Sequence, residues 1–159
     1  MAAILLTAAG GCYFWDQTIS ETSDYSIAIN SVSGLDPVTD LGQRPTLDPE
    51  FDITLGVASQ KRWAGECTQP GMYIEVSYRG VSLASSVTTM ERTCAGPRKE
   101  VDRHVVARGT GVVVPGSVLD SLAGDLRSGA EVFDVALRWT KYSYKPCGPR
   151  RVGDASASC

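Results

Sequence analysis

Alternation of apolar and polar residues is the feature that most constrains what this chain can fold into. Phe51–Ser59 (FDITLGVAS) places apolar residues at every second position, and Met72–Tyr78 and Glu131–Tyr144 follow the same period. Successive side chains of a strand point to opposite faces of a sheet, so this period predicts half-buried β-strands. A sheet that is apolar on one face needs a second layer to cover it.

The remaining segments predict further short strands and one helix. Tyr25–Leu35, Val81–Ala84 and Val101–Val114 are β-rich, and turn residues separate them. Val118–Leu126 instead has apolar residues three and four apart, which is the helical period, and Gly129 is placed to end a helix there. About seven strands with one short helix predict an all-β antiparallel sandwich.

The chain of 159 residues is the size of one domain, and we divide it into three parts. Residues 2–15 carry no charge but are shorter than the ~20 apolar residues of a spanning helix. We favour residues 1–18 as the outer end of a truncated membrane anchor. A weak signal or anchor segment and an ordinary buried strand or helix are the alternatives. Residues 19–145 are the predicted sandwich, and residues 146–159 are predicted to form a flexible tail.

Charge is distributed unevenly along the sequence. Residues 1–60 contain eight acidic and one basic residue, and residues 61–159 contain ten acidic and fourteen basic residues, which together give the net charge of −3. This balance argues against nucleic acid as a partner. The two parts either form a dipolar surface that faces an anionic partner such as phospholipid head groups, or neutralise each other on neighbouring strands, which is the simpler interpretation.

The five cysteines indicate an oxidising compartment, although five reduced thiols are the alternative. Cys67 and Cys94 flank one predicted hairpin unit, so we expect them to form a disulfide. An odd number leaves at least one cysteine unpaired within a monomer. None of the cysteines forms the CxxC spacing that is typical of a zinc ribbon.

No motif predicts catalysis, a metal site or a cofactor. His104 is the only histidine, and Asp102 lies on the same face of its predicted strand. This pair could activate a nucleophile in a hydrolase, but no nucleophile motif accompanies it, and a surface histidine is the simpler interpretation. Five acidic residues between Asp36 and Asp52 could bind calcium, or they could form a solvated loop, which we favour because prolines dominate the segment.

Aromatic residues beside lysines are the candidates for a membrane-facing surface. Trp139, Lys141 and Lys145 lie close together in the segment WTKYSYK, and aromatic and basic side chains suit a membrane interface. Trp63 is a further candidate for contact with a ligand or lipid. The alternation within WTKYSYK also fits packing between strands with a basic stripe, and we favour that interpretation.

The order of the strand segments resembles a known plant family. The succession FDITLGVAS, YIEVSYRGVSLA, VVARGTGVVVPGSVLDSL and GAEVFDVALRW is similar to the late-embryogenesis-abundant domain of the second subgroup. That domain also occurs in harpin-induced and disease-resistance-like plant membrane proteins and is related to the water-stress and hypersensitive-response domain. The similarity covers about residues 25–145.

The resemblance implies a seven-stranded sandwich similar to immunoglobulin and fibronectin type III domains. It implies one membrane helix before the sandwich, with the sandwich on the extracytosolic side of the plasma membrane. It also implies a non-catalytic interaction role in stress or defence responses, with a membrane lipid surface or a membrane protein as partner and no cofactor. The alternative is a soluble desiccation protectant or lipid-binding sandwich.

Overall fold

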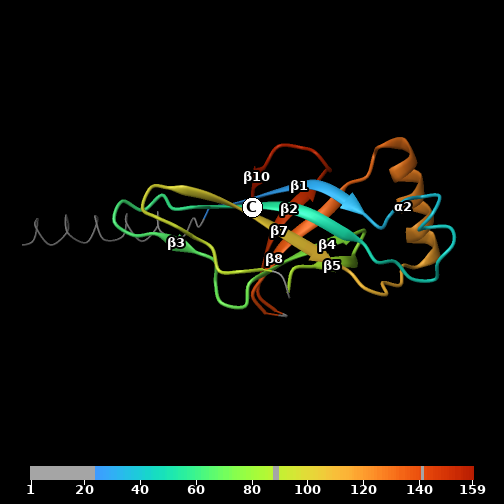
Figure 1. The fold of residues 1–159 in the computed structure, drawn as a ribbon, viewed down its shortest axis with the longest axis horizontal. Helices are drawn as coiled ribbons and strands as arrows, with labels where there is room; N and C mark the ends of the chain where they lie inside the picture. The colour runs from blue at the N-terminus through green and yellow to red at the C-terminus, as the bar shows by residue number, and fades with distance from the viewer. Residues whose placement is uncertain (1–23, 88–89, 141) are drawn as a thin grey trace, which may run out of the picture.

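The computed structural model describes residues 24–87, 90–140 and 142–159. Strands dominate these ranges, and one helix follows β7 (Figure 1). Seven of the strands have five residues or more. The elements are β1 (Asp24–Ser33), β2 (Glu50–Ala58), β3 (Glu66–Cys67), β4 (Tyr73–Tyr78), β5 (Val81–Ser85), β6 (Cys94–Ala95), β7 (Glu100–Arg108), α2 (Gly116–Ser128), β8 (Phe133–Arg138), β9 (Tyr144–Arg150) and β10 (Ala157–Ser158).

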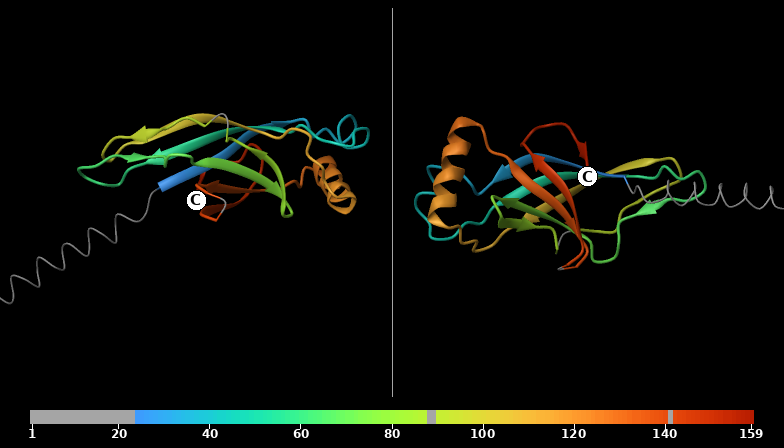
Figure 2. Two further views of the ribbon diagram at one scale, coloured as in Figure 1. Left: turned by 90° about the horizontal axis from the view of Figure 1, so that it is seen from below. Right: turned by 180° about the vertical axis from the view of Figure 1, so that it is seen from behind.

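Eight strands form one antiparallel sheet in the order β10-β1-β2-β7-β5-β4-β8-β9. The sheet folds into two layers at the junction of β5 and β7, where the register pairs Ser85 with Arg108. Its outer edges return toward each other, because Ile29 of β1 forms a bridge with Val152 after β9. The sheet therefore nearly closes into a barrel (Figure 2), and the prediction of an all-β sandwich is confirmed.

The core fills the space between the two layers with the residues that the alternation places inside. Ile53 and Leu55 of β2 are fully buried. Phe51 of β2 meets Phe133 of β8 edge to face, with ring centroids 5.0 Å apart, and Tyr78 of β4 lies 6.2 Å from Phe133. The contact between Phe51 and Phe133 joins one layer to the other, whereas Tyr78 and Phe133 lie on the paired strands β4 and β8 of one layer.

Gly109 allows a close approach between strands at the end of β7. A Cβ at this position would lie 2.0 Å from the carbonyl oxygen of Leu83 and 2.8 Å from a methyl group of Val112. Only glycine fits such a gap without displacing backbone, as expected of a glycine in a strand-like segment.

Helix α2 begins two residues earlier and ends two residues later than the segment with the helical period. Leu122 is its fully buried residue, and the helix ends at Gly129, whose φ of 69° is left-handed. The hydroxyl of Tyr78 donates to the Asp125 carboxylate over 2.5 Å and so ties the helix to β4. Burial, reinforced by this acceptor, raises the pKa of Tyr78.

The prediction of a flexible tail over residues 146–159 is wrong. Most of β9 lies in this segment, where Pro146 pairs with Ala136 of β8, and the sandwich continues to β10. A disulfide between Cys147 and Cys159 closes the segment. The prolines are tolerated because β9 is an edge strand, where a missing N–H need not break the ladder. The predicted segment 1–18 lies outside the described residues.

Candidate interaction surface

Two chain segments extend beyond the sandwich and form an arm, which we define as residues 59–68 and 93–99. Figure 1 shows the arm, marked by β3, at the end of the molecule opposite α2. Within it β3 pairs with β6, and the disulfide predicted between Cys67 and Cys94 is present. Two further backbone hydrogen bonds join the two segments. The Ser59 N–H donates to the Lys99 carbonyl over 2.9 Å, and the Arg98 N–H donates to the Lys61 carbonyl over 3.2 Å.

Small and polar residues form the interior of the arm. Ser59, Thr68 and Thr93 are buried there together with Ala95. The Ser59 hydroxyl donates to the Ala64 carbonyl over 2.7 Å, and the Thr93 N–H donates to the Thr68 hydroxyl over 3.0 Å. Such an interior satisfies its hydrogen bonds but buries little apolar surface, so the disulfide is a main constraint on its shape.

The outer surface of the tip combines positive charge with one aromatic ring. We call Lys61, Arg62, Trp63, Arg98 and Lys99 the basic tip. The Trp63 side chain is 89 % exposed, more than the other exposed large hydrophobic residues of the described ranges. Arg62, Arg98 and Lys99 are also exposed.

Opposing charge within the arm is small. The arm contains four basic residues and one acidic residue, Glu66, which gives a charge of +3. Glu66 is largely buried and pairs with Lys61 at 3.5 Å, so the exposed charge of the tip is positive. Glu100, at the start of β7, is the nearest exposed carboxylate along the chain.

The described chain begins beside the base of the arm. Asp24, the first residue of β1, pairs with Ala58, the last residue of β2, and its carboxylate accepts a hydrogen bond from the Gln60 side chain. The next residue, Tyr25, is buried and donates its hydroxyl to the Cys67 carbonyl over 3.2 Å. Burial, with a smaller contribution from the negative charge of Glu66, raises the pKa of Tyr25 to about 12.

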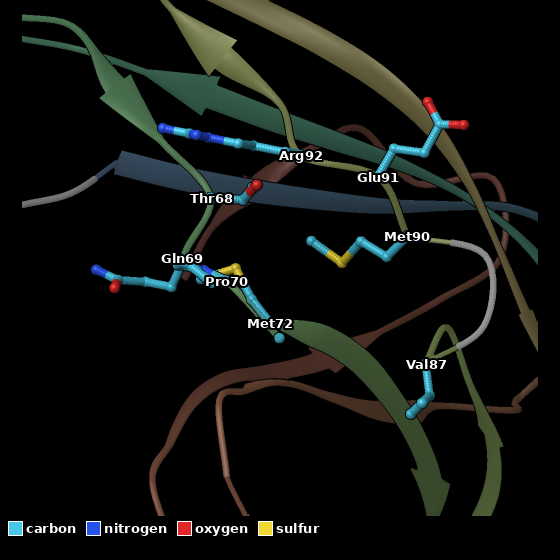
Figure 3. Close-up of a pocket in the computed structure, with 9 residues that line it drawn as sticks. Thr68, Gln69, Pro70, Met72, Val87, Met90, Glu91 and Arg92 are labelled. Atoms are coloured by element: carbon cyan, nitrogen blue, oxygen red, sulfur yellow. The ribbon is translucent and has the colours of Figure 1, made fainter.

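A shallow cavity of about 190 Å³ lies between residues 68–72, before β4, and residues 87 and 90–92, after β5 (Figure 3). Met72 and Met90 supply apolar surface, and Glu91 and Arg92 lie at its rim. The cavity is smaller than the ~300 Å³ at which ligand pockets begin, and Glu91 pairs with Arg103 at 3.3 Å. These features give no basis for assigning a substrate to it.

His104 lies beside a different carboxylate from the one the sequence suggested. Its Nε2 contacts the carboxylate of Asp52 on the neighbouring strand β2, and both side chains are substantially exposed. The Asp52 carboxylate also accepts a bond from the Asn30 side chain. The arrangement is an ion pair on the open face of a sheet when the histidine is protonated.

The acidic residues between positions 36 and 52 serve local structure. Asp36 accepts two backbone N–H bonds from its own turn, of 2.8 and 3.0 Å, and these bonds lower its pKa. Asp48 accepts the N–H of Gly111 over 2.8 Å, and Glu50 pairs with Arg108 at 3.0 Å. Within the described ranges, no cluster of three or more potential ligands could hold a metal ion.

Of the three residues predicted to face a membrane, the two that the structure describes are only partly exposed. Trp139 is partly buried and packs against the core, as the packing interpretation expected. Lys145 is half-buried in β9, and Lys141 lies outside the described residues. The exposed tryptophan of the described chain is Trp63, the further candidate for contact with a ligand or lipid.

Comparisons with protein-family models, curated proteins and solved structures found no match to this chain. In the part of the chain that the structure describes, no helix is long and apolar enough to cross a membrane.

Proposed function

We propose that this chain is a non-catalytic interaction domain that works at a membrane surface, with its sandwich on the extracytosolic side. The observation that carries the proposal is the placement of β1. The chain enters the sandwich beside the base of the arm, and the sequence before β1 includes the uncharged residues 2–15. An anchor in those residues would hold the basic tip near the membrane.

Two further observations support this role. The disulfides Cys67–Cys94 and Cys147–Cys159 suit an oxidising compartment. The resemblance to the late-embryogenesis-abundant domain of the second subgroup favours a role in plant stress or defence responses, with a membrane lipid surface or a membrane protein as partner.

Alkaline carbonate extraction of the full chain, expressed from its own start codon in plant cells, tests the anchor. We expect the protein in the membrane pellet. Leu5→Glu/Leu6→Glu should move it to the supernatant, because each charge within a membrane helix costs about 2.5–3.5 kcal/mol. Val38→Glu, at an exposed position of the sandwich, is the control and should leave the protein in the pellet.

Recovery of the wild-type chain in the supernatant would reject the anchor and favour the soluble protectant or lipid-binding alternative.

The compartment is tested separately, by counting the thiols that react with a maleimide before and after reduction. We expect four thiols to become reactive only after reduction, since four cysteines form the two disulfides. Reaction of these four thiols without prior reduction, which gives five reactive thiols with Cys12, would place the sandwich in the cytosol.

A further inference from the structure

We propose that the basic tip docks onto anionic phospholipid, with the Trp63 ring in the head-group region and Arg62, Arg98 and Lys99 on the lipid phosphates and carboxylates. The inference deepens the proposed function, because it names the surface that meets the membrane and the class of lipid that it meets. It assigns this contact to the arm and not to the WTKYSYK segment.

Trp63 supplies the apolar part of the contact. Its ring is 89 % exposed to solvent, so almost no protein surface covers it. An indole ring is amphipathic and concentrates at membrane–water interfaces, where its apolar body and its N–H are both accommodated. Because the arm projects from the sandwich (Figure 1), an exposed tryptophan on it can reach such an interface before the rest of the sandwich does.

The cations supply charge of the sign that anionic lipid requires. Arg62 and Trp63 are neighbours in one segment of the ribbon, and Arg98 and Lys99 lie in the other. The Arg98 N–H donates to the Lys61 carbonyl, so the backbone places the two segments side by side. Basic groups near an anionic bilayer each contribute about fivefold to binding, which is the equivalent of about 1 kcal/mol.

The arm holds these side chains in place before any contact. Its disulfide and cross-ribbon hydrogen bonds fix both segments, and the close approach of Gly65 to Ala95, whose oxygen would lie 2.5 Å from an added Cβ, packs them together. Docking then orders few additional groups, and this lowers its entropic cost.

The chain length before β1 is compatible with this contact. Eight residues, 16–23, separate the uncharged segment from Asp24, and they span at most about 29 Å when extended. Because Asp24 pairs with Ala58, a chain anchored through residues 2–15 keeps the base of the arm within this short distance of the bilayer. The anchored sandwich therefore meets lipid at a high effective concentration.

The test uses the full chain reconstituted into vesicles of phosphatidylcholine alone or of phosphatidylcholine with phosphatidylserine. The emission of Trp63 is obtained as the difference between the wild type and Trp63→Phe, since the chain contains three tryptophans. We expect the Trp63 emission to move to shorter wavelength, and to be quenched by lipids with brominated chains, in the phosphatidylserine vesicles. Both effects should weaken in pure phosphatidylcholine and at high salt.

Two matched double variants identify the charges responsible. Arg62→Gln/Lys99→Gln should lower the ratio of quenched to unquenched Trp63 by about 25-fold, at about fivefold for each cation. Arg44→Gln/Arg127→Gln removes the same charge from exposed positions outside the arm and should leave the ratio unchanged.

The outcomes separate this inference from the proposed function. A chain that stays in the carbonate pellet while Trp63 is unquenched in phosphatidylserine vesicles overturns the docking and leaves the anchor standing. A chain that leaves the pellet while Trp63 is quenched supports the docking and rejects the anchor. Equal quenching in both vesicle types, or equal losses in both double variants, overturns the role of anionic lipid.

Discussion

The sandwich and the arm are stabilised in different ways. Between the two layers of the sandwich, large apolar residues such as Phe51, Ile53 and Phe133 are fully buried. In the arm the buried residues are small, as Ala95 and Ser59 are, and a disulfide and backbone hydrogen bonds join its segments. Hydrophobic burial dominates the first region, and constraint of the chain contributes most to the second.

This difference shows how one short domain can separate stability from surface chemistry. The sandwich requires apolar residues at fixed positions, and their period leaves little freedom in its sequence. The arm has no such requirement at its tip, so it can carry an exposed Trp63 beside several cations without a cost in core packing.

The largest loss of stability is expected from Phe133→Ala. Phe133 is fully buried and contacts both Phe51 and Tyr78, so its removal leaves a cavity between the layers. The free energy of unfolding should fall by about 3–5 kcal/mol. Urea denaturation followed by circular dichroism measures this loss, and Phe133→Leu, which keeps most of the volume, should lose clearly less. A loss below ~1 kcal/mol in Phe133→Ala would show that the layers are not held together at this point.

Removal of the arm disulfide should have the next largest effect. Cys67→Ser/Cys94→Ser opens a loop with a sequence separation of 27. The unfolded chain then gains conformational entropy, and the free energy of unfolding should fall by about 3–4 kcal/mol. Cys147→Ser/Cys159→Ser, with a separation of 12, is the matched comparison and should lose about 3 kcal/mol.

Hydrogen exchange distinguishes the two disulfide variants by location. In Cys67→Ser/Cys94→Ser, the N–H groups of Thr68 and Arg98, which bond across the arm, should lose protection while β8 keeps its own. Loss of protection throughout the sandwich in this variant would show that arm and sandwich unfold together and would remove the distinction between them.

Tyr25→Phe tests the junction of sandwich and arm. The free energy of unfolding should fall by about 1 kcal/mol at neutral pH, because the hydrogen bond from the Tyr25 hydroxyl to the Cys67 carbonyl is lost. Burial raises the pKa of Tyr25 from 10.0 to about 12, so between these values the unfolded chain loses the proton first. The folded state is then stabilised fully below pH 10 and progressively less up to about pH 12.

Urea unfolding at pH 9 and pH 11 checks this pH dependence. The loss of stability between the two values should be smaller in Tyr25→Phe than in the wild type. Part of the loss should remain, because the pKa of Tyr78 is raised as well. An equal loss in both proteins would show that Tyr25 ionises as it does in the unfolded chain.

The sequence predicts the sandwich well because period-2 alternation directly reports which face of a strand is buried. The cores of β2 and β4, the helix that ends at Gly129, and the Cys67–Cys94 pair all follow from local patterns. The tail could not be predicted in this way. Pro146 and Pro149 interrupt any alternation, and β9 depends on pairing with β8 and on a disulfide that no spacing rule selects.

The candidate surface is harder to predict because it depends on contacts between distant segments. Arg62 and Trp63 are separated by more than thirty residues from Arg98 and Lys99, and their proximity follows from the pairing of β3 with β6. Sequence patterns placed Trp139 and Trp63 among the same aromatic candidates. Only the fold distinguishes them, since one ring packs on the core and the other faces solvent.

The smallest effect on stability is expected at the residue that we propose to be most important at the membrane. Trp63→Ala should change the free energy of unfolding by less than about 0.5 kcal/mol, because an exposed ring loses almost no packing, whereas Trp139→Ala removes partly buried contacts and should cost more. Urea denaturation of both variants tests this difference. A loss above ~1 kcal/mol in Trp63→Ala would mean that the ring is held against the protein. Trp63 would then have a structural role, and its ring would not be available as the apolar part of a contact with lipid.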